Sequence, residues 1–219
     1  MFELKLSKNN KDEPNEFLFI GAHCDDIEIG CGGVVLKLIK EYPKAFFRWI
    51  VFSSTEQRAA EALNSSDLFL SATQNKEVVL KDFHNGYFPY IGAEIKDYFE
   101  ALKKTINPDI IFTHHGQDYH QDHRILSELT WNTFRNHFIL EYEIPKYDGG
   151  LGSPNIFFSL NQSESQKKVE ILLQCFTSER LTKKWFTAET FRGLMRLRGV
   201  ECNASSGYAE AFYCRKAAF

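Results

Sequence analysis

Residues 21–33, which read GAHCDDIEIGCGG, follow directly on the apolar run Phe17-Leu18-Phe19-Ile20. An apolar run of this length that ends at a glycine predicts a buried strand, then a tight turn and a helix. One imidazole, from His23, and two adjacent carboxylates, from Asp25 and Asp26, stand at the end of that strand. Charged side chains are costly in a core, so their presence here indicates a functional site.

A second polar cluster has the same placement. Residues 113–123, THHGQDYHQDH, follow the apolar run Ile110-Ile111-Phe112. Two clusters of His and Asp side chains, each at the end of a strand, suggest a metal site.

The rest of the chain alternates between apolar runs and helical patterns. We expect strands over residues 16–22, 46–52, 78–80, 109–113 and 155–160. We expect helices over residues 28–41, 56–62 and beyond, 91–102, 166–175 and 187–197. A further helix should start near Asp118 or His120 and carry Trp131, Phe134 and Phe138 on one face.

This alternation predicts an α/β fold: a single Rossmann-like domain over residues 1–219, with a mostly parallel sheet flanked by helices. No internal repeat or low-complexity linker marks a domain boundary. In open α/β sheets, ligands bind at the carboxyl ends of the strands. Both polar clusters fall at such ends.

Composition narrows the class of protein. The chain has 219 residues, 43% of them hydrophobic, and a net charge of -3, which argues against a generic nucleic-acid binder. Residues 1–8 lack the apolar stretch of a signal peptide, and no segment is long enough to span a bilayer. The five cysteines show no Cys-x-x-Cys spacing, so we expect reduced thiols and a cytoplasmic location.

His23, Asp26 and His123 form a ligand set that suits zinc. Three protein ligands leave one position for water, which is typical of a catalytic zinc site. Adjacent residues of a turn point in different directions, so Asp25 could face that water as general base. His120 lies one helical turn before His123 and could point at the substrate, with Asp122 hydrogen-bonded to it and keeping it protonated.

The chain resembles the LmbE-like, or GlcNAc-phosphatidylinositol-type (PIG-L), N-deacetylase family over about residues 16–215. The resemblance rests on residues 23–33, on Pro108 to His114, on His120-Gln121-Asp122-His123 and on the late segment Tyr208 to Phe212. It implies an LmbE-like fold and a hydrolase with one zinc ion per chain, which removes an acyl group, usually acetyl, from an amino sugar. It implies that His23, Asp26 and His123 are zinc ligands, that Asp25 is the general base, and that His120, supported by Asp122, stabilises the oxyanion.

Two positions depart from the family pattern. Cys24 stands where the family usually has proline, and its thiol could add a ligand near the metal. His84-Asn85-Gly86 stands where the family often has an Asp-Gly turn that contacts sugar hydroxyls. We expect Asn85 to contact substrate, and Arg58, which matches a family pattern, to bind sugar hydroxyls or a phosphate.

Other polar and glycine positions have structural explanations. Residues 30–33, GCGG, do not match a dinucleotide fingerprint and should allow close helix–sheet packing. His114 and His115 should be structural or support the ligands. Arg192, Arg196 and Arg198 should form a solvated helix face, with a contact to a substrate phosphate as the alternative.

The sequence therefore predicts a zinc-dependent N-deacetylase that acts on a small amino-sugar conjugate, with a water activated by Asp25 and an oxyanion stabilised by zinc and His120. Hydrolysis of another acyl amide, a carbamate or an ester at the same site is one alternative. A non-catalytic protein that binds a sugar or nucleotide is another. A homo-oligomer is possible.

Overall fold

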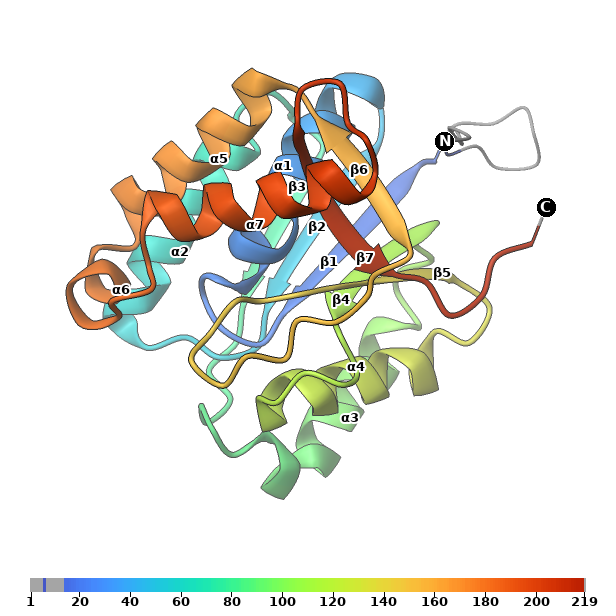
Figure 1. Ribbon diagram of the computed structural model, residues 1–219. Helices are drawn as coiled ribbons and strands as arrows, with labels where there is room; N and C mark the ends of the chain where they lie inside the picture. Colours follow the sequence, from blue (N-terminus) through green and yellow to red (C-terminus); the bar gives the residue numbers. More distant parts are fainter. Residues whose placement is uncertain (1–5, 7–13, 219) are drawn as a thin grey trace.

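The computed structural model describes residues 6 and 14–218, and these form a single seven-stranded sheet covered by helices (Figure 1). The strands are β1 Glu16–Gly21, β2 Phe46–Val51, β3 Lys76–Leu80, β4 Ile110–His114, β5 Phe138–Tyr142, β6 Ile156–Leu160 and β7 Tyr208–Tyr213. Their order is β3-β2-β1-β4-β5-β7-β6. The first five strands of that order are parallel, and β7 is antiparallel to both of its neighbours.

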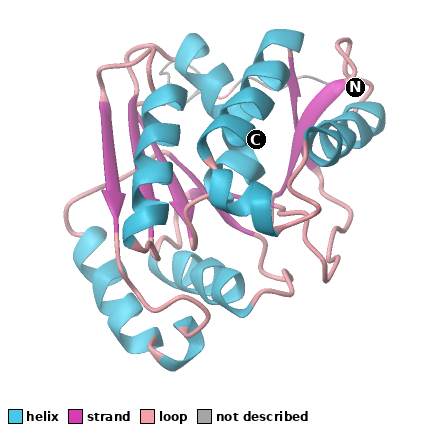
Figure 2. Ribbon diagram, turned by 90° about the vertical axis from the view of Figure 1, so that its left-hand side faces the viewer, coloured by secondary structure: helices cyan, strands magenta, loops and turns pink. Residues whose placement is uncertain are grey.

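Helices pack against both faces of this sheet (Figures 1 and 2). They are α1 Asp26–Glu41, α2 Glu56–Phe69, α3 Gly92–Leu102, α4 Gln121–Thr133, α5 Gln162–Cys175, α6 Thr177–Thr182 and α7 Ala188–Glu201, with a 3₁₀ turn, η1, at Phe88–Tyr90. Helices α1, α2, α5 and α7 lie on one face, and α3 and α4 lie on the other. The α/β fold class predicted from the sequence is confirmed.

Strand β1 shows why the sheet is buried on both faces. Phe17 and Phe19 point into the core beneath α1, whereas Leu18 and Ile20 point into the core beneath α3 and α4. Successive side chains of a strand alternate between faces, so a strand that is apolar at every position must be covered on both. The run Phe17 to Ile20 therefore fixes a central position for β1.

Two strands were not foreseen. Phe138 was expected on a helical face with Phe134, but α4 ends at Thr133 and Phe138 begins β5. The spacing of four residues fits a helix, but α4 ends at Thr133 and Phe134 is already its C-cap. The segment Tyr208 to Tyr213, for which no element was predicted, forms the antiparallel strand β7.

The glycines of residues 30–33 confirm the expectation of close packing. A Cβ atom on Gly30 would overlap the ring of the buried Tyr142, and one on Gly33 would overlap Leu160. The arginine prediction was wrong for Arg198. Its guanidinium is buried in a bidentate pair with Glu143, at 2.7 Å from Nε to Oε1 and 2.7 Å from Nη2 to Oε2.

The five cysteines are unpaired, as predicted. None of the helices in the described part of the chain has the length and apolarity that a membrane span requires. Residues 1–8, which the sequence analysis examined for a signal peptide, lie outside the described residues except for Leu6.

We expect Gly30→Ala to lower the free energy of unfolding by about 1–3 kcal/mol, because the added methyl group must displace the Tyr142 ring. Urea denaturation measures this difference. Gly193→Ala is the matched control, since no heavy atom lies within 4 Å of its added Cβ in helix α7. Alanine there should stabilise the helix by up to ~1 kcal/mol. Equal effects of the two changes would contradict the packing explanation.

Candidate active site

The two polar clusters meet at the carboxyl edge of the sheet, between β1 and β4. From these two neighbouring strands the chain proceeds toward opposite edges of the sheet: from β1 to β2 and β3 on one side, and from β4 to β5 on the other. Such a switch point leaves a crevice outside the strand ends, where ligands of open α/β sheets bind. His23, Asp25 and Asp26 come from the turn between β1 and α1, and His120, Asp122 and His123 from the start of α4.

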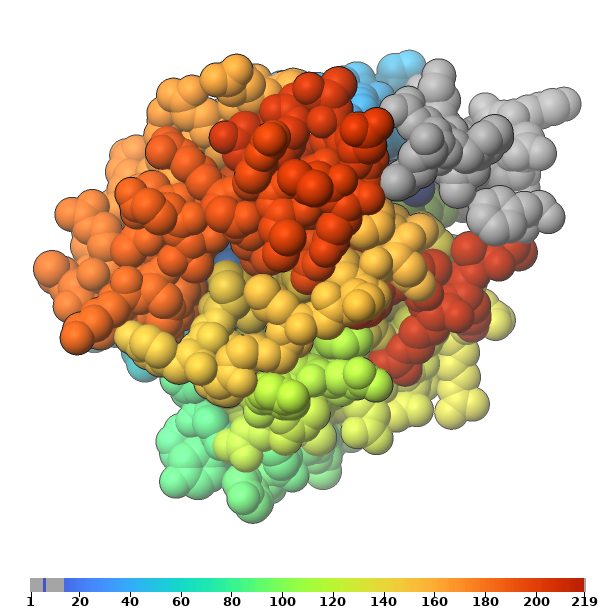
Figure 3. All heavy atoms as spheres, in the orientation of Figure 1, coloured from blue at the N-terminus to red at the C-terminus, as the bar shows by residue number. Residues whose placement is uncertain are grey.

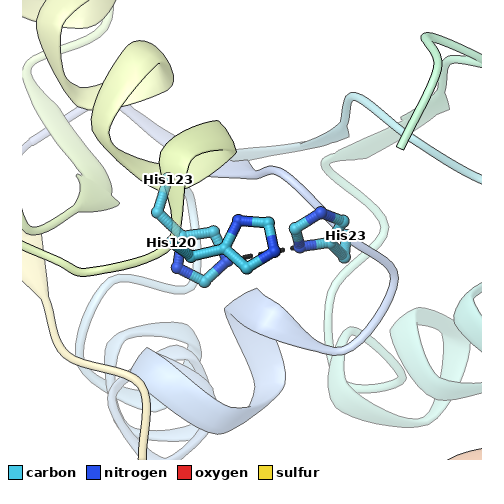
Figure 4. A group of neighbouring side chains, drawn as sticks. All are labelled: His23, His120 and His123. Carbon is cyan, nitrogen blue, oxygen red and sulfur yellow. Dashed lines mark hydrogen bonds between the residues drawn. The ribbon is translucent and has the colours of Figure 1, made fainter. Parts of the chain in front are cut away.

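The donor atoms of His23, Asp26 and His123 converge at this edge. Figure 4 shows the rings of His23 and His123, with the ring of His120 beside them. His123 Nε2 lies 3.2 Å from His23 Nδ1 and 3.4 Å from Asp26 Oδ1, and His23 Nδ1 lies 3.2 Å from Asp26 Oδ2. Zinc–nitrogen bonds of 2.0–2.1 Å in a tetrahedral site place ligand atoms about 3.3 Å apart. The His23 and His123 nitrogens therefore have the spacing of two zinc ligands, each with a different oxygen of Asp26 beside it. Among the described residues, two groups of three have ligand atoms within 4.8 Å of one another: His23, His120 and His123, and Asp26, His114 and His123.

Carboxylates face the outer nitrogen of both imidazoles. His23 Nε2 lies 3.3 Å from Asp122 Oδ2, and His123 Nδ1 lies 3.1 Å from Asp118 Oδ2. A carboxylate behind a histidine fixes which ring nitrogen keeps its proton and is a common feature of metal sites. It leaves His23 Nδ1 and His123 Nε2 free to act as ligands.

The charges of the site favour a cation. Burial alone would raise the pKa of Asp26, but the rings of His123, His114 and His23 hold it well below its usual range. Burial alone would lower the pKa of His23, but Asp26 and Asp122 outweigh this effect and raise it to about 10. In the metal-free protein, a proton on His23 therefore supplies the positive charge that a metal ion would bring.

Asp25 lies beside this centre and is held by an arginine. Arg58 Nη2 donates to Asp25 Oδ1 at 2.9 Å, and Nη1 of the same side chain contacts Glu179 of α6. Asp25 Oδ2 forms no hydrogen bond with any described residue. Arg58, expected on the substrate side, thus pairs with the expected general base.

His120 and Asp122 lie close together, but their contact differs from the one expected. The carboxylate of Asp122 accepts the N–H groups of Gly86 at 2.6 Å and Phe88 at 3.1 Å and faces His23. The backbone N–H of Asp122 donates to His120 Nδ1 at 3.2 Å.

The expectation of a protonated His120 is therefore corrected. Burial, with the positive charge of His123 and His23, lowers the pKa of His120 to about 4. Because Nδ1 accepts a hydrogen bond, the neutral ring carries its proton on Nε2.

Sequence reasoning missed the role of Asp118. It was expected as a possible helix start, but His120 caps α4, and Asp118 instead contacts His123 and accepts from Lys146 Nζ at 2.6 Å. The signal available was a second carboxylate, besides Asp122, within the second cluster. His114 was expected to be structural or to support the ligands. Its Nε2 accepts the N–H of Ala22 at 2.9 Å and lies 3.3 Å from Asp26 Oδ2.

The two positions that depart from the family pattern lie around the centre. Cys24 is buried, its thiol points to the carbonyl of Ser53, and burial raises its pKa to about 12, so it supplies no thiolate. Asn85 is exposed in the turn that Gly86 ties to Asp122.

One segment covers part of the molecule next to this edge. In Figure 3, the gold chain that follows β5 lies between the red-orange C-terminal helices and the green α3 and α4. It includes Lys146, the partner of Asp118, and Tyr147, whose hydroxyl accepts the N–H of Lys184.

A family model described as PIG-L, GlcNAc-PI de-N-acetylase, matches residues 18–134. That range contains every residue predicted for the site. No curated protein sequence matches the chain.

Solved structures share the fold at low sequence identity. N,N'-diacetylchitobiose deacetylase from Pyrococcus horikoshii is 18% identical, with a TM-score of 0.66 over 96% of this chain and 86% of that chain. A deacetylase of teicoplanin biosynthesis is 12% identical, with a TM-score of 0.71 over 91% and 97%. The 4-carboxy-2-hydroxymuconate hydratase GalB from Pseudomonas putida KT2440 is 14% identical, with a TM-score of 0.74 over 94% and 98%.

We expect zinc binding to release a proton at pH 7. His23, with a pKa of about 10, is protonated in the metal-free protein, and a metal ligand must give up the proton on Nδ1. Affinity should therefore rise with pH toward about 10 and fall as the pH is lowered. Calorimetric titration in buffers of different ionisation enthalpy counts the protons.

His120→Gln is the control for this titration. Its ring is already neutral at pH 7, so its loss should leave the proton count unchanged. A binding enthalpy that does not depend on the buffer would contradict the assignment of His23.

Proposed function

The chain belongs to the PIG-L family, and on that basis we propose that it is a zinc-dependent hydrolase that removes an N-acetyl group from a small amino-sugar conjugate. One observation carries the proposal. His23 Nδ1 and His123 Nε2 lie 3.2 Å apart, the spacing of two ligands of a tetrahedral zinc ion, and each has one oxygen of Asp26 within 3.4 Å. Asp25 and His120 lie beside them. A bound zinc ion would lower the pKa of a coordinated water to about 7 and polarise the amide carbonyl.

Asp25 acts as the general base. Its Oδ1 is held by Arg58, which leaves Oδ2 to take a proton from the attacking water. The protonated carboxyl then delivers this proton to the departing amine. Burial of Asp25, which is 4% exposed, keeps the transfer away from bulk solvent.

His120 stabilises the oxyanion as a neutral donor. With Nδ1 accepting the N–H of Asp122, the ring presents Nε2–H to the developing negative charge. A hydrogen bond from a neutral imidazole requires no proton transfer and suits a site that already carries positive charge.

The substrate contacts proposed for this site are those at its rim. Asn85 lies in an exposed turn that Asp122 ties to the centre, and it can hydrogen-bond to sugar hydroxyls. Deacetylation is favoured over hydrolysis of other acyl bonds by the family of the chain. The solved structures support the fold alone.

Asp25→Asn should lower kcat by about 10²- to 10⁴-fold while zinc stays bound, because the base is lost and the ligands are kept. His123→Ala should lose the metal. The measurements are zinc content and amine release from a panel of N-acetylated sugars, free and nucleotide-linked. About one zinc ion per chain with amine release that Asp25→Asn abolishes is the expected result.

Two outcomes would argue against the proposed hydrolase. A protein that takes up no zinc would refute the metal site. A protein that binds the panel sugars equally well without zinc, and never releases amine, would favour the non-catalytic alternative.

Arg58→Gln should lower kcat by about 10- to 100-fold with little change in KM, because Arg58 holds Asp25 and misplacement of a base slows the chemical step. A rise in KM at unchanged kcat would instead support a substrate contact for Arg58. Lys183→Gln is the control, since Lys183 pairs with the same Glu179 and makes no described contact with Asp25. Initial rates over a range of substrate concentrations separate the two constants.

A further inference from the structure

Helix α1 is interrupted five residues after it begins. Cys31 has φ -146° and ψ 17°, far from the helical values near -63° and -42°. In a continuous helix, the N–H of Gly33 would bond to the carbonyl of Ile29, and that of Val34 to the carbonyl of Gly30. Both N–H groups donate instead to a side chain of β7, and the first turn, from Asp26 to Gly30, is set at an angle to the rest of the helix.

A buried ion pair fills the interruption. Glu210 of β7 accepts the N–H of Gly33 at 2.9 Å and that of Val34 at 2.7 Å. Lys168 of α5 donates to the carbonyl of Ile29 at 2.5 Å and to Glu210 at 2.6 Å. Both side chains are less than 5% exposed.

The interruption creates two new helix ends, and each side chain of the pair caps one of them. The carboxylate of Glu210 lies at the new N-terminus, and the ammonium of Lys168 lies at the new C-terminus, which are the ends where their charges are favourable. The elements that supply them, α5 and β7, both pack against α1 (Figure 1).

The short first turn carries a metal ligand. Asp26 lies three residues before Ile29, whose carbonyl Lys168 holds. If the interruption closed into a regular helix, the change in φ at Cys31 would be about 80°, and the first turn would rotate away from His23 and His123.

We infer that Lys168 and Glu210 are positioning residues for the metal centre, which hold α1 open so that Asp26 meets His23 and His123. The inference rests on the metal site of the proposed function. It extends that site to residues beyond 18–134, the range that the family model matches. A buried ion pair contributes little to stability on average, so its hydrogen bonds to three backbone groups across an interruption indicate a geometric role.

The test measures zinc affinity in two variants of the full chain, Lys168→Met and Glu210→Gln. Competition with a chromophoric chelator gives the Kd, and circular dichroism checks that each variant is folded. We expect the Kd to rise by about 10- to 100-fold in both variants, because partners outside the ligand set usually change metal affinity by this amount.

Arg198→Met is the matched control. It breaks another buried ion pair, Arg198–Glu143, whose described hydrogen bonds go to Glu143, Glu201 and Gly152 and not to α1. This variant should lose thermal stability in the same way and keep the zinc affinity of the wild type.

The outcomes separate this inference from the proposed function. Wild-type affinity in folded Lys168→Met or Glu210→Gln would overturn the positioning role and leave the metal site intact. An equal loss in Arg198→Met would also overturn it, because general destabilisation would then explain the effect. If the wild type binds no zinc, the metal site and this inference fall together. If Lys168→Met does not fold, Glu210→Gln, which keeps one oxygen for the N–H groups, decides alone.

Discussion

A buried carboxylate imposes the main constraint on this molecule. Asp26 is 3% exposed, and an ionised group in that position must be compensated by positive charge and hydrogen bonds. The rings of His23 and His123 face it, and it accepts the N–H of His23 at 2.7 Å. The elements that supply these groups are the turn after β1 and the start of α4. Their meeting requires β1 and β4 to be neighbours, which is the central feature of the sheet order.

The charged side chains around Asp26, His23 and His123 are themselves held by further hydrogen bonds and ion pairs. Asp122 and Asp118 face the outer nitrogens of His23 and His123. Asp122 also accepts two N–H groups of the turn that holds Asn85, so the orientation of a metal ligand and the shape of the rim depend on one side chain. Arg58 performs the corresponding task for Asp25. Lys168 and Glu210 hold the backbone beneath Asp26. Each outer group thus fixes the side chains inside it.

The fold and the meeting of the two polar clusters at one edge of the sheet could be predicted because their signals are local. A four-residue apolar run and a following His-x-Asp-Asp segment need no tertiary knowledge to interpret. The contacts that sequence reasoning missed depend on side-chain direction. From the sequence, Asp122 could face His120 or His23; in the structure it faces His23 and accepts the N–H groups of Gly86 and Phe88. Arg198 has the spacing of a solvated helix face, yet its guanidinium is buried because it pairs with Glu143. The helix prediction for Phe138 was wrong because its spacing of four residues from Phe134 fits both the helical period of 3.6 and the strand period of 2.

The neutral state of His120 follows from the same charge constraint. A bound cation lowers the pKa of any imidazole next to it. A metal ion at this centre would therefore repel an imidazolium at His120 and favour the neutral ring. A neutral Nε2–H donor avoids this conflict. In the proposed mechanism, proton transfer then falls to Asp25, whose Oδ1 is held by the Arg58 guanidinium while Oδ2 is left for the attacking water. The proposed roles are thus divided between two neighbours: His120 stabilises charge, and Asp25 moves the proton from the water to the amine.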